Sequence, residues 1–327
     1  MTLYAILIAS LLSLHAAPPA PPAGPPPVPF LQGRRWGYSD REKKLLVPPR
    51  YNSARPFREG LAAVVDGKGR HGFIDASGKE IIPPAYQSAG DFHGGLAAVR
   101  LKGRWGCITR TGAVSVPFEY EELALSENGP AAAKKDGRWG LLDTASGVFS
   151  PTAYEEILPF SEGLARVRAA GRYGFIDPAG AEAVPPVYDE ASPFREGFSS
   201  ARLRMRYGFI NLGTRVFKPR EFFGIGPLGG GLAPAESREG APDRCGYIDA
   251  QGSEKLGFNW SACGPFAEGL APVRRITDGK WGYVDASGNE AIPFRYDRAS
   301  PFEGGTAKVV RGSRTFYIDR LGAEYFK

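Results

Sequence analysis

A basic side chain stands immediately before an aromatic-glycine pair, or a variant of that pair, in nine places along the 327-residue chain. Guanidinium and ammonium groups bind carboxylate, phosphate and sulfate, so a regular row of them is typical of a surface that holds a polyanion or an acidic protein. The competing interpretation is that each cation lies along a neighbouring aromatic ring and pairs with an acid such as Asp75 or Glu162. The nine candidate ligand-binding residues are Arg35, Arg70, Arg104, Arg138, Arg172, Arg206, Arg244, Lys280 and Arg314.

The three histidines offer no catalytic arrangement. His71 takes the place of the aromatic in its copy of the pair, His93 precedes two glycines, and His15 lies in an apolar N-terminal segment. The sequence contains no His-Glu-x-x-His motif, phosphate-binding loop or serine elbow. We therefore expect a protein that is not an enzyme and that uses neither a metal nor another cofactor.

Adjacent acids at Glu121-Glu122 and Glu155-Glu156 could indicate glycoside hydrolysis, which requires two carboxylates at a defined separation. Both pairs directly follow a tyrosine, at the place where another copy of the same unit has Asp189. A position that recurs from copy to copy belongs to the scaffold, so we interpret these acids as solvated loop residues.

The cysteines form an odd set of Cys107, Cys245 and Cys263, which allows at most one internal disulfide. Cys245 and Cys263 lie in the same copy and could pair, although their spacing alone establishes no bond. The interpretation we favour is that all three are small buried apolar side chains. An enzyme site assembled in the irregular segment 224–263, with Asp243, is a less favoured alternative.

The elements that position these residues form a tandem repeat, because the aromatic-glycine pair returns about every 34 residues. In the copy that starts at Trp281, Asp285 and Gly288 predict a tight hairpin turn. Pro293 then marks a strand end or an edge strand, and Tyr296 supplies a large buried ring. We expect the aromatic of the pair to fill the interior as well, and its glycine to leave room for a neighbouring backbone or ring.

A loop of the form Phe-x-Glu-Gly follows in most copies, for example at residues 160–163, and an alternating stretch such as residues 164–168 comes after it. Period-two alternation predicts a strand with one buried face, and helical periodicity is absent. The fold class predicted is all-β, with each unit a meander of three short antiparallel strands.

The pattern Arg-Trp-Gly-Phe/Tyr-Ile-Asp, Ile-Pro-Pro-x-Tyr-Asp and Phe-x-Glu-Gly-Leu-Ala-x-Val resembles the WG (KWG) repeat of bacterial proteins over about residues 33–325. The resemblance implies an all-β bacterial repeat protein, often exported, and it supplies no catalytic residues. The copies at Tyr207 and Cys245 match the pattern least well.

Two architectures fit such units. A propeller blade normally needs four strands and about 40 residues, and the two ends of this chain duplicate the same strand instead of completing a shared blade. We therefore favour an open, twisted, solenoid-like stack of meanders, with a β-propeller-like ring as the alternative.

The N-terminus carries an apolar run at residues 3–14 that is too short to span a bilayer and is typical of a secretory signal peptide. We expect a signal peptide at 1–17, a proline-rich linker at 18–32, and a repeat domain at 33–327 with about eight repeats and a partial ninth. The mature protein would then be secreted or periplasmic, without a membrane span. The formal charge of +6 is mild for this length, so no nucleic acid is expected as a partner.

These observations favour a non-enzymatic extracytoplasmic binding scaffold that recognises a protein or an anionic envelope polymer through its repeat surface. The alternative is a carbohydrate-binding, lectin-like module in which tyrosine and tryptophan rings stack on sugars. That alternative requires several of the aromatic rings to be open to solvent.

Overall fold

The computed structural model describes residues 25–126, 128–237 and 244–327. Every regular element in these ranges is a β-strand, and the strands form antiparallel meanders in which sequence neighbours pair. The all-β prediction is therefore confirmed. The signal peptide predicted at 1–17 and residues 18–24 of the predicted linker lie outside the described residues. No helix long and apolar enough to cross a membrane occurs in the described ranges.

The strands of the first half of the chain are β1 (Val28–Gln32), β2 (Arg35–Ser39), β3 (Leu45–Tyr51), β4 (Ser53–Ala54), β5 (Ala62–Val65), β6 (His71–Ile74), β7 (Glu80–Tyr86), β8 (Ser88–Ala89), β9 (Leu96–Leu101), β10 (Arg104–Thr109), β11 (Val114–Tyr120), β12 (Glu122–Ala124), β13 (Ala131–Lys135), β14 (Arg138–Leu142), β15 (Phe149–Pro151), β16 (Glu156–Ile157), β17 (Ala165–Ala169) and β18 (Arg172–Ile176).

Those of the second half are β19 (Glu182–Tyr188), β20 (Glu190–Ala191), β21 (Phe198–Leu203), β22 (Arg206–Asn211), β23 (Phe217–Arg220), β24 (Gly224–Ile225), β25 (Ala233–Glu236), β26 (Cys245–Ile248), β27 (Glu254–Cys263), β28 (Leu270–Arg275), β29 (Trp281–Asp285), β30 (Glu290–Tyr296), β31 (Arg298–Ala299), β32 (Thr306–Arg311), β33 (Arg314–Asp319) and β34 (Glu324–Tyr325).

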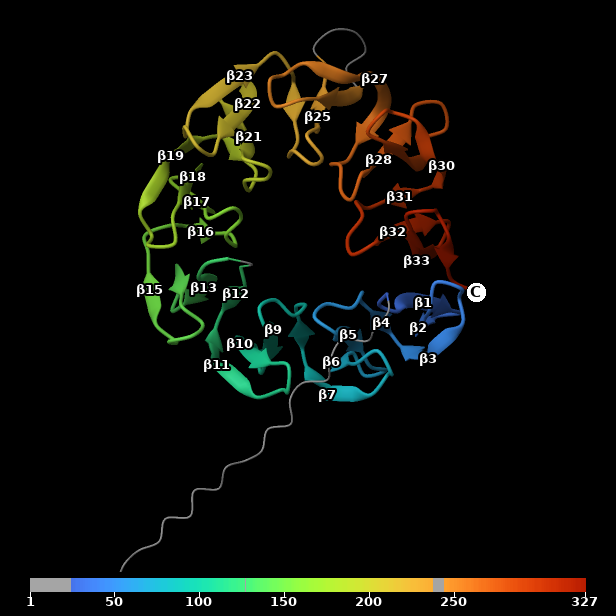
Figure 1. Cartoon of the computed structure of the whole chain (residues 1–327). Coiled ribbons are helices and arrows are strands. Elements are labelled where there is room, and N and C mark those ends of the chain that lie inside the picture. Colours follow the sequence, from blue (N-terminus) through green and yellow to red (C-terminus); the bar gives the residue numbers. More distant parts are fainter. Residues whose placement is uncertain (1–24, 127, 238–243) are drawn as a thin grey trace, which may run out of the picture.

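A typical unit has four strands, not the three predicted. The sheet β4-β5-β6-β7 is representative, and its first strand is only two residues long. This short strand lies on the inner side of the arrangement in Figure 1, whereas β7 lies at the outer rim. A two-residue strand leaves no alternating pattern in the sequence, which is why it escaped prediction.

The outer strand explains the glycine of the aromatic-glycine pair. In β10 and β11, Trp105 faces Tyr120 and Cys107 faces Val116, so a bulge of the outer strand presses against Gly106 between them. A Cβ atom on Gly106 would lie 2.6 Å from the Val116 carbonyl oxygen. The expectation that this glycine makes room for a neighbouring backbone is confirmed. Pro117 lies in this outermost strand, as predicted for an edge position.

The predicted turn chemistry is also confirmed. The Oδ1 atom of Asp75 accepts hydrogen bonds from the backbone amides of Ser77, at 2.9 Å, and Lys79, at 3.0 Å. Gly78 in the same turn has a φ of 84°, which glycine adopts without steric cost. These aspartates shape the turns between the third and fourth strands.

The hydrophobic core is divided among the interfaces between consecutive sheets. One cluster joins Phe73 and Ile82 of one sheet to Phe92, Val99 and Ile108 of the next. The Phe73 and Phe92 rings lie 4.8 Å apart between centroids. Each sheet is therefore stabilised mainly by its two neighbours, as expected for a repeat protein.

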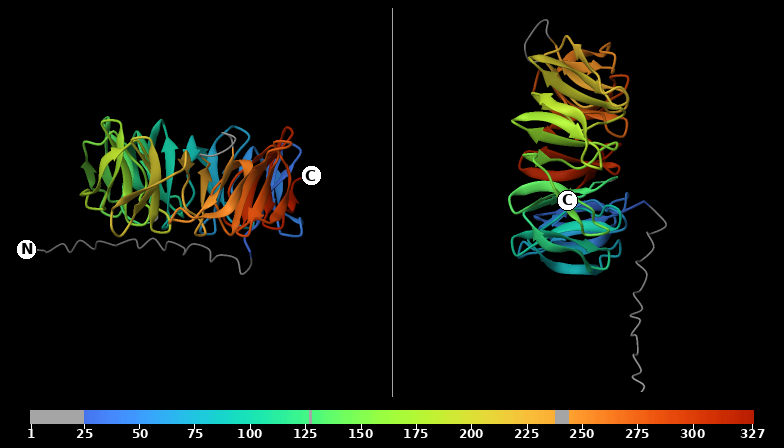
Figure 2. Two further views of the ribbon diagram at one scale, coloured as in Figure 1. Left: turned by 90° about the horizontal axis from the view of Figure 1, so that it is seen from above. Right: turned by 90° about the vertical axis from the view of Figure 1, so that its left-hand side faces the viewer.

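The sheets follow one another around a circular path, seen face-on in Figure 1 and edge-on as a flat disc in Figure 2. An open stack would have its two ends apart from each other. In the structure, the first and last sheets are in contact. Leu31 forms a parallel bridge with Phe326, and the Trp36 and Tyr317 rings lie 5.7 Å apart between centroids.

The boundary of the predicted linker was also wrong. Residues 28–32 form β1, which pairs along its length with β2, and both Val28 and Phe30 are buried. The strand was missed because the segment is rich in proline. Its apolar residues Val28, Phe30 and Leu31 lie at the end of that proline-rich segment, on either side of Pro29. The repeat domain therefore includes β1.

Candidate functional site

The nine cations occupy equivalent positions at one end of their sheets. Each stands at, or immediately before, the start of the strand that carries the aromatic-glycine pair, as Arg104 does in β10 and Arg138 in β14. Because equivalent strands run in the same direction in every unit, all nine lie on one face of the disc. Eight are exposed and Lys280 is half-buried. Residues of the turn after that strand, such as Lys79, lie on the opposite face.

Many of these cations pair with a polar side chain seventeen residues later, at the end of the outer strand. Arg104 approaches Glu121 at 3.5 Å, and the Lys280 ammonium lies 2.5 Å from Asp297. Lys280 and a backbone amide hold the pKa of Asp297 below its usual value. The equivalent pairs Arg35 with Asn52 and Arg172 with Asp189 form in the same way.

Much of the series therefore pairs with polar side chains or lies over an aromatic ring, as the interpretation that competes with ligand binding expects. The partners are not Asp75 or Glu162. Arg70 pairs with Asp66 of its own turn at 2.8 Å, and Arg314 lies over the Phe326 ring at 5.4 Å. Among the described residues, the side chains of Arg138, Arg206 and Arg244 form no ion pair, hydrogen bond or cation–π contact. These three are the cations of the series that are most available to an external anion.

Arg138 borders a groove between two sheets that also contains a second cation. The groove is lined by Lys135, Tyr120, Phe149, Glu119 and Asp136, and Lys135 pairs with Glu119 at 2.9 Å. The unpaired guanidinium thus stands beside a partly neutralised ammonium group and two aromatic rings. Two acids accompany the two cations of this groove, so any attraction for an anionic ligand here depends on the unpaired Arg138 guanidinium.

The acids after the core tyrosines have a structural role that the sequence did not indicate. Glu121 accepts a hydrogen bond of 3.1 Å from the amide of Gly137 in the next hairpin turn. Glu155 accepts one of 3.3 Å from Gly171 and also approaches Arg168 at 3.5 Å. Although they are partly solvated, as predicted, these carboxylates tie each outer strand to the following sheet.

A second set of acids, missed by sequence reasoning, links the loops of the form Phe-x-Glu-Gly. Glu196 accepts hydrogen bonds from the amides of Gly230, at 2.7 Å, and Gly231, at 2.8 Å, in the loop of the next sheet. The recurrence of this glutamate was the signal that could have revealed the link. The carboxylates that make such contacts are Glu59, Glu162, Glu196 and Glu268.

The aromatic of the pair does not fill the interior, contrary to expectation. Trp105, Trp139, Tyr173 and Tyr207 are half-buried, as is His71, which stands at the same position. The residue two places further on is the one that fills the core, as Phe73 and Phe175 do. One edge of each paired ring therefore remains open beside the row of cations.

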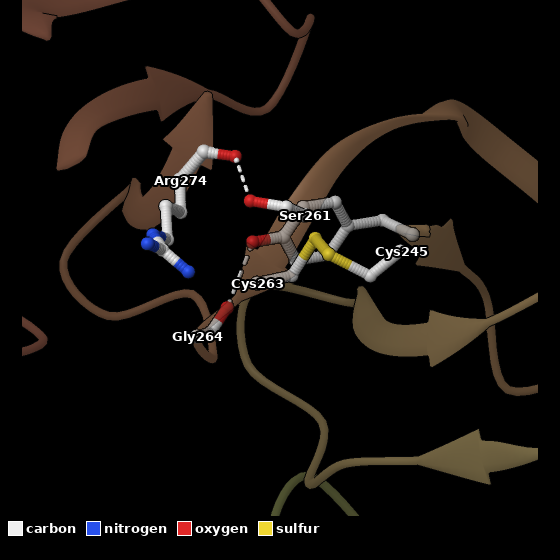
Figure 3. Close-up of a disulfide and its surroundings, with 6 residues drawn as sticks. Cys245, Ser261, Cys263, Gly264 and Arg274 are labelled. Atoms are coloured by element: carbon white, nitrogen blue, oxygen red, sulfur yellow. Dashed lines mark hydrogen bonds between the residues drawn. A yellow bond between two sulfur atoms is a disulfide. The ribbon is translucent and has the colours of Figure 1, made fainter. Parts of the chain in front are cut away.

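Cys245 and Cys263 form a disulfide between β26 and the end of β27 (Figure 3). Strand β27 is the outer strand of one unit and continues as the inner strand of the next, pairing with both β26 and β28. The bond therefore ties together two neighbouring units. The favoured interpretation of all three cysteines as small buried apolar side chains was therefore wrong for Cys245 and Cys263. It holds for Cys107, a buried free thiol whose pKa is raised to about 12 by burial.

The remaining candidates for chemistry lie apart from one another. His71 packs half-buried, with a pKa lowered mainly by burial, and His93 lies exposed in a loop. No group of three metal-ligating side chains occurs within the described ranges. Asp243 lies outside the described residues.

Comparison with known sequences supports the repeat assignment. A family model described as WG containing repeat matches residues 36–68, 72–105, 105–139, 139–172, 173–204, 246–281 and 281–313. The matched segments leave out residues 205–245, which include the weak Tyr207 copy. A search of curated proteins gives no match to this chain.

Solved structures show a similar fold at low sequence identity. The structure of a eukaryotic initiation factor is 10% identical with a TM-score of 0.61, covering 91% of this chain and 94% of its own. A dihydro-heme d1 dehydrogenase, NirN, is 14% identical with a TM-score of 0.50, covering 94% and 74% respectively. The similar structures are β-propeller-like proteins.

Proposed function

This chain belongs to the family of WG containing repeat proteins, and we propose that it is a non-enzymatic binding scaffold that acts outside the cytoplasm. Its ligand is a protein or an anionic envelope polymer, held on the face that carries the nine cations. The observation that carries the proposal is the placement of the cations on one face, with Arg138, Arg206 and Arg244 uncommitted among the described residues. A rigid array of equivalent units is suited to a ligand that is itself extended or repetitive.

The proposal includes a closed ring as the working form. The Lys327 amide donates a 2.8 Å hydrogen bond to the Leu31 carbonyl oxygen, and Asn52 makes the same bond to Val65 in the next sheet. An ion pair between Arg58 and Glu303 joins the loops on either side of the first sheet. Closure fixes the spacing of the cations, so a ligand that spans several units meets a preformed surface.

The extracytoplasmic location is supported by the disulfide, because such bonds persist in oxidising compartments. The apolar segment at residues 3–14 supports it from the sequence. Fusion of an enzyme that is active only after export to residue 327 tests the location. Activity of the fusion in intact cells is expected, and its loss when residues 1–17 are removed would identify the exporting segment. A fusion that is inactive in intact cells would contradict the location.

The binding proposal is tested by capture from envelope extracts at low and high salt, with and without divalent ions. We expect an anionic polymer or an acidic protein to be retained at low salt and released at high salt, because salt screens exposed charges. Recovery of no partner under any of these conditions would contradict the proposal.

A carbohydrate-binding module is the second candidate, and one specific observation favours it. The aromatic rings of the pair are partly rather than fully buried, so part of each ring can reach a ligand. Rings such as Tyr173 and Tyr207 could therefore contact a sugar, since aromatic side chains offer a large apolar body at the protein surface.

A further inference from the structure

The repeat is interrupted where Cys245 replaces the aromatic of the pair. A groove of about 510 Å³ lies beside Cys245 and the partly buried ring of Tyr207 in the preceding unit. Glu190, Glu236 and Arg244 also line this groove. No other copy of the pair has a cysteine at this position.

The floor of the groove is rigid and close to the backbone. The disulfide of Cys245 and Cys263 lies in it, and Gly224 and Gly226 contribute no side chains. Figure 3 shows Ser261 beside the disulfide, with its hydroxyl donating to the Arg274 carbonyl oxygen at 3.3 Å. A ligand can therefore reach backbone and hydroxyl groups whose positions are already fixed.

A second groove of about 390 Å³ continues from the first, and the two share Glu190 and Tyr207. The second groove adds Tyr173, Arg166 and Ser192 to the lining. Together the two grooves form a track that passes two aromatic rings from consecutive units. A ligand that fills both must consist of at least two linked units.

The charges along the track balance. Two carboxylates, Glu190 and Glu236, face two guanidinium groups, Arg166 and Arg244. Arg166 donates to the Ala191 carbonyl oxygen at 2.8 Å, which fixes its orientation. This lining offers donors and acceptors without a net field, which suits an uncharged ligand rich in hydroxyl groups rather than a polyanion.

Tyr207 is the central element of the track. Glu190 and Glu236 line the same groove as this ring. Burial and the charges of these two carboxylates raise the pKa of the Tyr207 hydroxyl, against the opposing effect of Arg202. Glu190 in turn pairs with Arg202 at 2.8 Å, which holds the carboxylate in place. The Tyr207 ring can contact a sugar ring, and the carboxylates beside it can accept hydrogen bonds from the sugar hydroxyls.

We propose that this track, defined by Tyr173, Glu190, Tyr207, Glu236 and Ser261, binds a neutral oligosaccharide of two or more sugar units. The proposal rests on the carbohydrate-binding candidate above and gives it a site away from the uncommitted Arg138. It differs from the main proposal in ligand charge and in the residues used.

The test uses calorimetric titration of the full chain with glucose, N-acetylglucosamine, and the hexamers of malto-, cello- and chito-oligosaccharides. We expect at least one hexamer to bind about tenfold more tightly than its single sugar, because the hexamer fills both grooves. Tyr207→Ala is expected to weaken that binding by about tenfold. Trp139→Ala, which alters the same repeat position away from the track, is expected to retain it.

Glu190→Gln provides a variant that keeps side-chain size, with Glu122→Gln at the equivalent place in another sheet as its control. Weaker binding in the first variant alone supports the proposal. Failure of every hexamer to bind at about 5 mM, or equal losses in Tyr207→Ala and Trp139→Ala, would overturn it. Binding of polygalacturonate, an anionic polysaccharide, reports on the cationic face, so the two proposals can fail separately.

Discussion

The backbone amide of Lys327 donates a hydrogen bond of 2.8 Å to the carbonyl oxygen of Leu31, nearly 300 residues earlier in the chain. The amides of Asn52, Glu121, Glu155 and Asp189 make the same bond where an outer strand passes to the next sheet. The C-terminal residue therefore contacts the first sheet through the same backbone hydrogen bond that joins the end of an outer strand to the next sheet elsewhere in the array.

Contact between the first and last sheets predicts energetic coupling between Trp36 and Tyr317. In a double-mutant cycle with Trp36→Leu and Tyr317→Leu, we expect a coupling of about 1 kcal/mol in the free energy of unfolding, because the rings meet edge to face. Chemical denaturation of the four proteins measures it. A cycle of Trp36→Leu with Phe149→Leu, on the other side of the ring, should be additive. Additivity in both cycles would contradict closure.

The glycine of the aromatic-glycine pair is predicted to be irreplaceable. Gly106→Ala places a Cβ atom 2.6 Å from the Val116 carbonyl oxygen, and we expect it to lower the free energy of unfolding by about 3 kcal/mol. Gly103→Ala is the control, since its φ is +81° but its Cβ meets nothing within 4 Å. That control should cost about 1 kcal/mol. Equal effects in denaturant melts would show that the bulge does not press on Gly106.

The link from Glu196 to the next loop is predicted to contribute to stability. Glu196→Ala removes the acceptor for the amides of Gly230 and Gly231, and we expect a loss of about 1 kcal/mol in the free energy of unfolding. Hydrogen exchange of those two amides should accelerate as well. Glu42→Ala, an exposed acid in a turn, should change neither quantity. Unaltered exchange at Gly230 and Gly231 would contradict the link.

Thiol titration tests the cysteine assignments. Without reductant, the unfolded chain should expose one reactive thiol, Cys107, and after reduction it should expose all three. In the folded protein Cys107 should not react at pH 8, because burial raises its pKa to about 12 and its thiolate is scarce below that pH. Detection of three thiols in the unfolded, unreduced chain would contradict the disulfide. Rapid reaction of the folded protein at pH 8 would contradict the burial of Cys107.

The sequence predicts the period, the turns and the outer proline strand, because each depends on residues close together in the chain. Asp75 and Gly78 determine a turn locally, and Pro117 cannot donate within a central ladder. The contact between the first and last sheets depends instead on the small rotation between successive sheets, added over the whole array, which no local pattern encodes. The open stack was predicted for that reason.

The candidate site was predicted in part. The cations lie on one face, as their regular spacing indicated. Many of their partners come from the end of the outer strand. The position of that strand end depends on the bulge opposite Gly106, which the sequence does not reveal. The half-exposed state of Trp105 and its equivalents follows from the same geometry. The groove at Cys245 could not be anticipated, because its lining combines residues from several strands of neighbouring sheets.

The most direct test of the proposed binding face is a titration with polygalacturonate at about 50 mM and 500 mM salt. We expect binding that weakens at high salt, and in Arg104→Ala/Arg138→Ala about tenfold weaker binding at low salt with an unchanged melting temperature. Lys79→Ala/Arg215→Ala removes two cations from the opposite face and should bind as the unaltered protein does. Unchanged affinity in Arg104→Ala/Arg138→Ala would contradict the account.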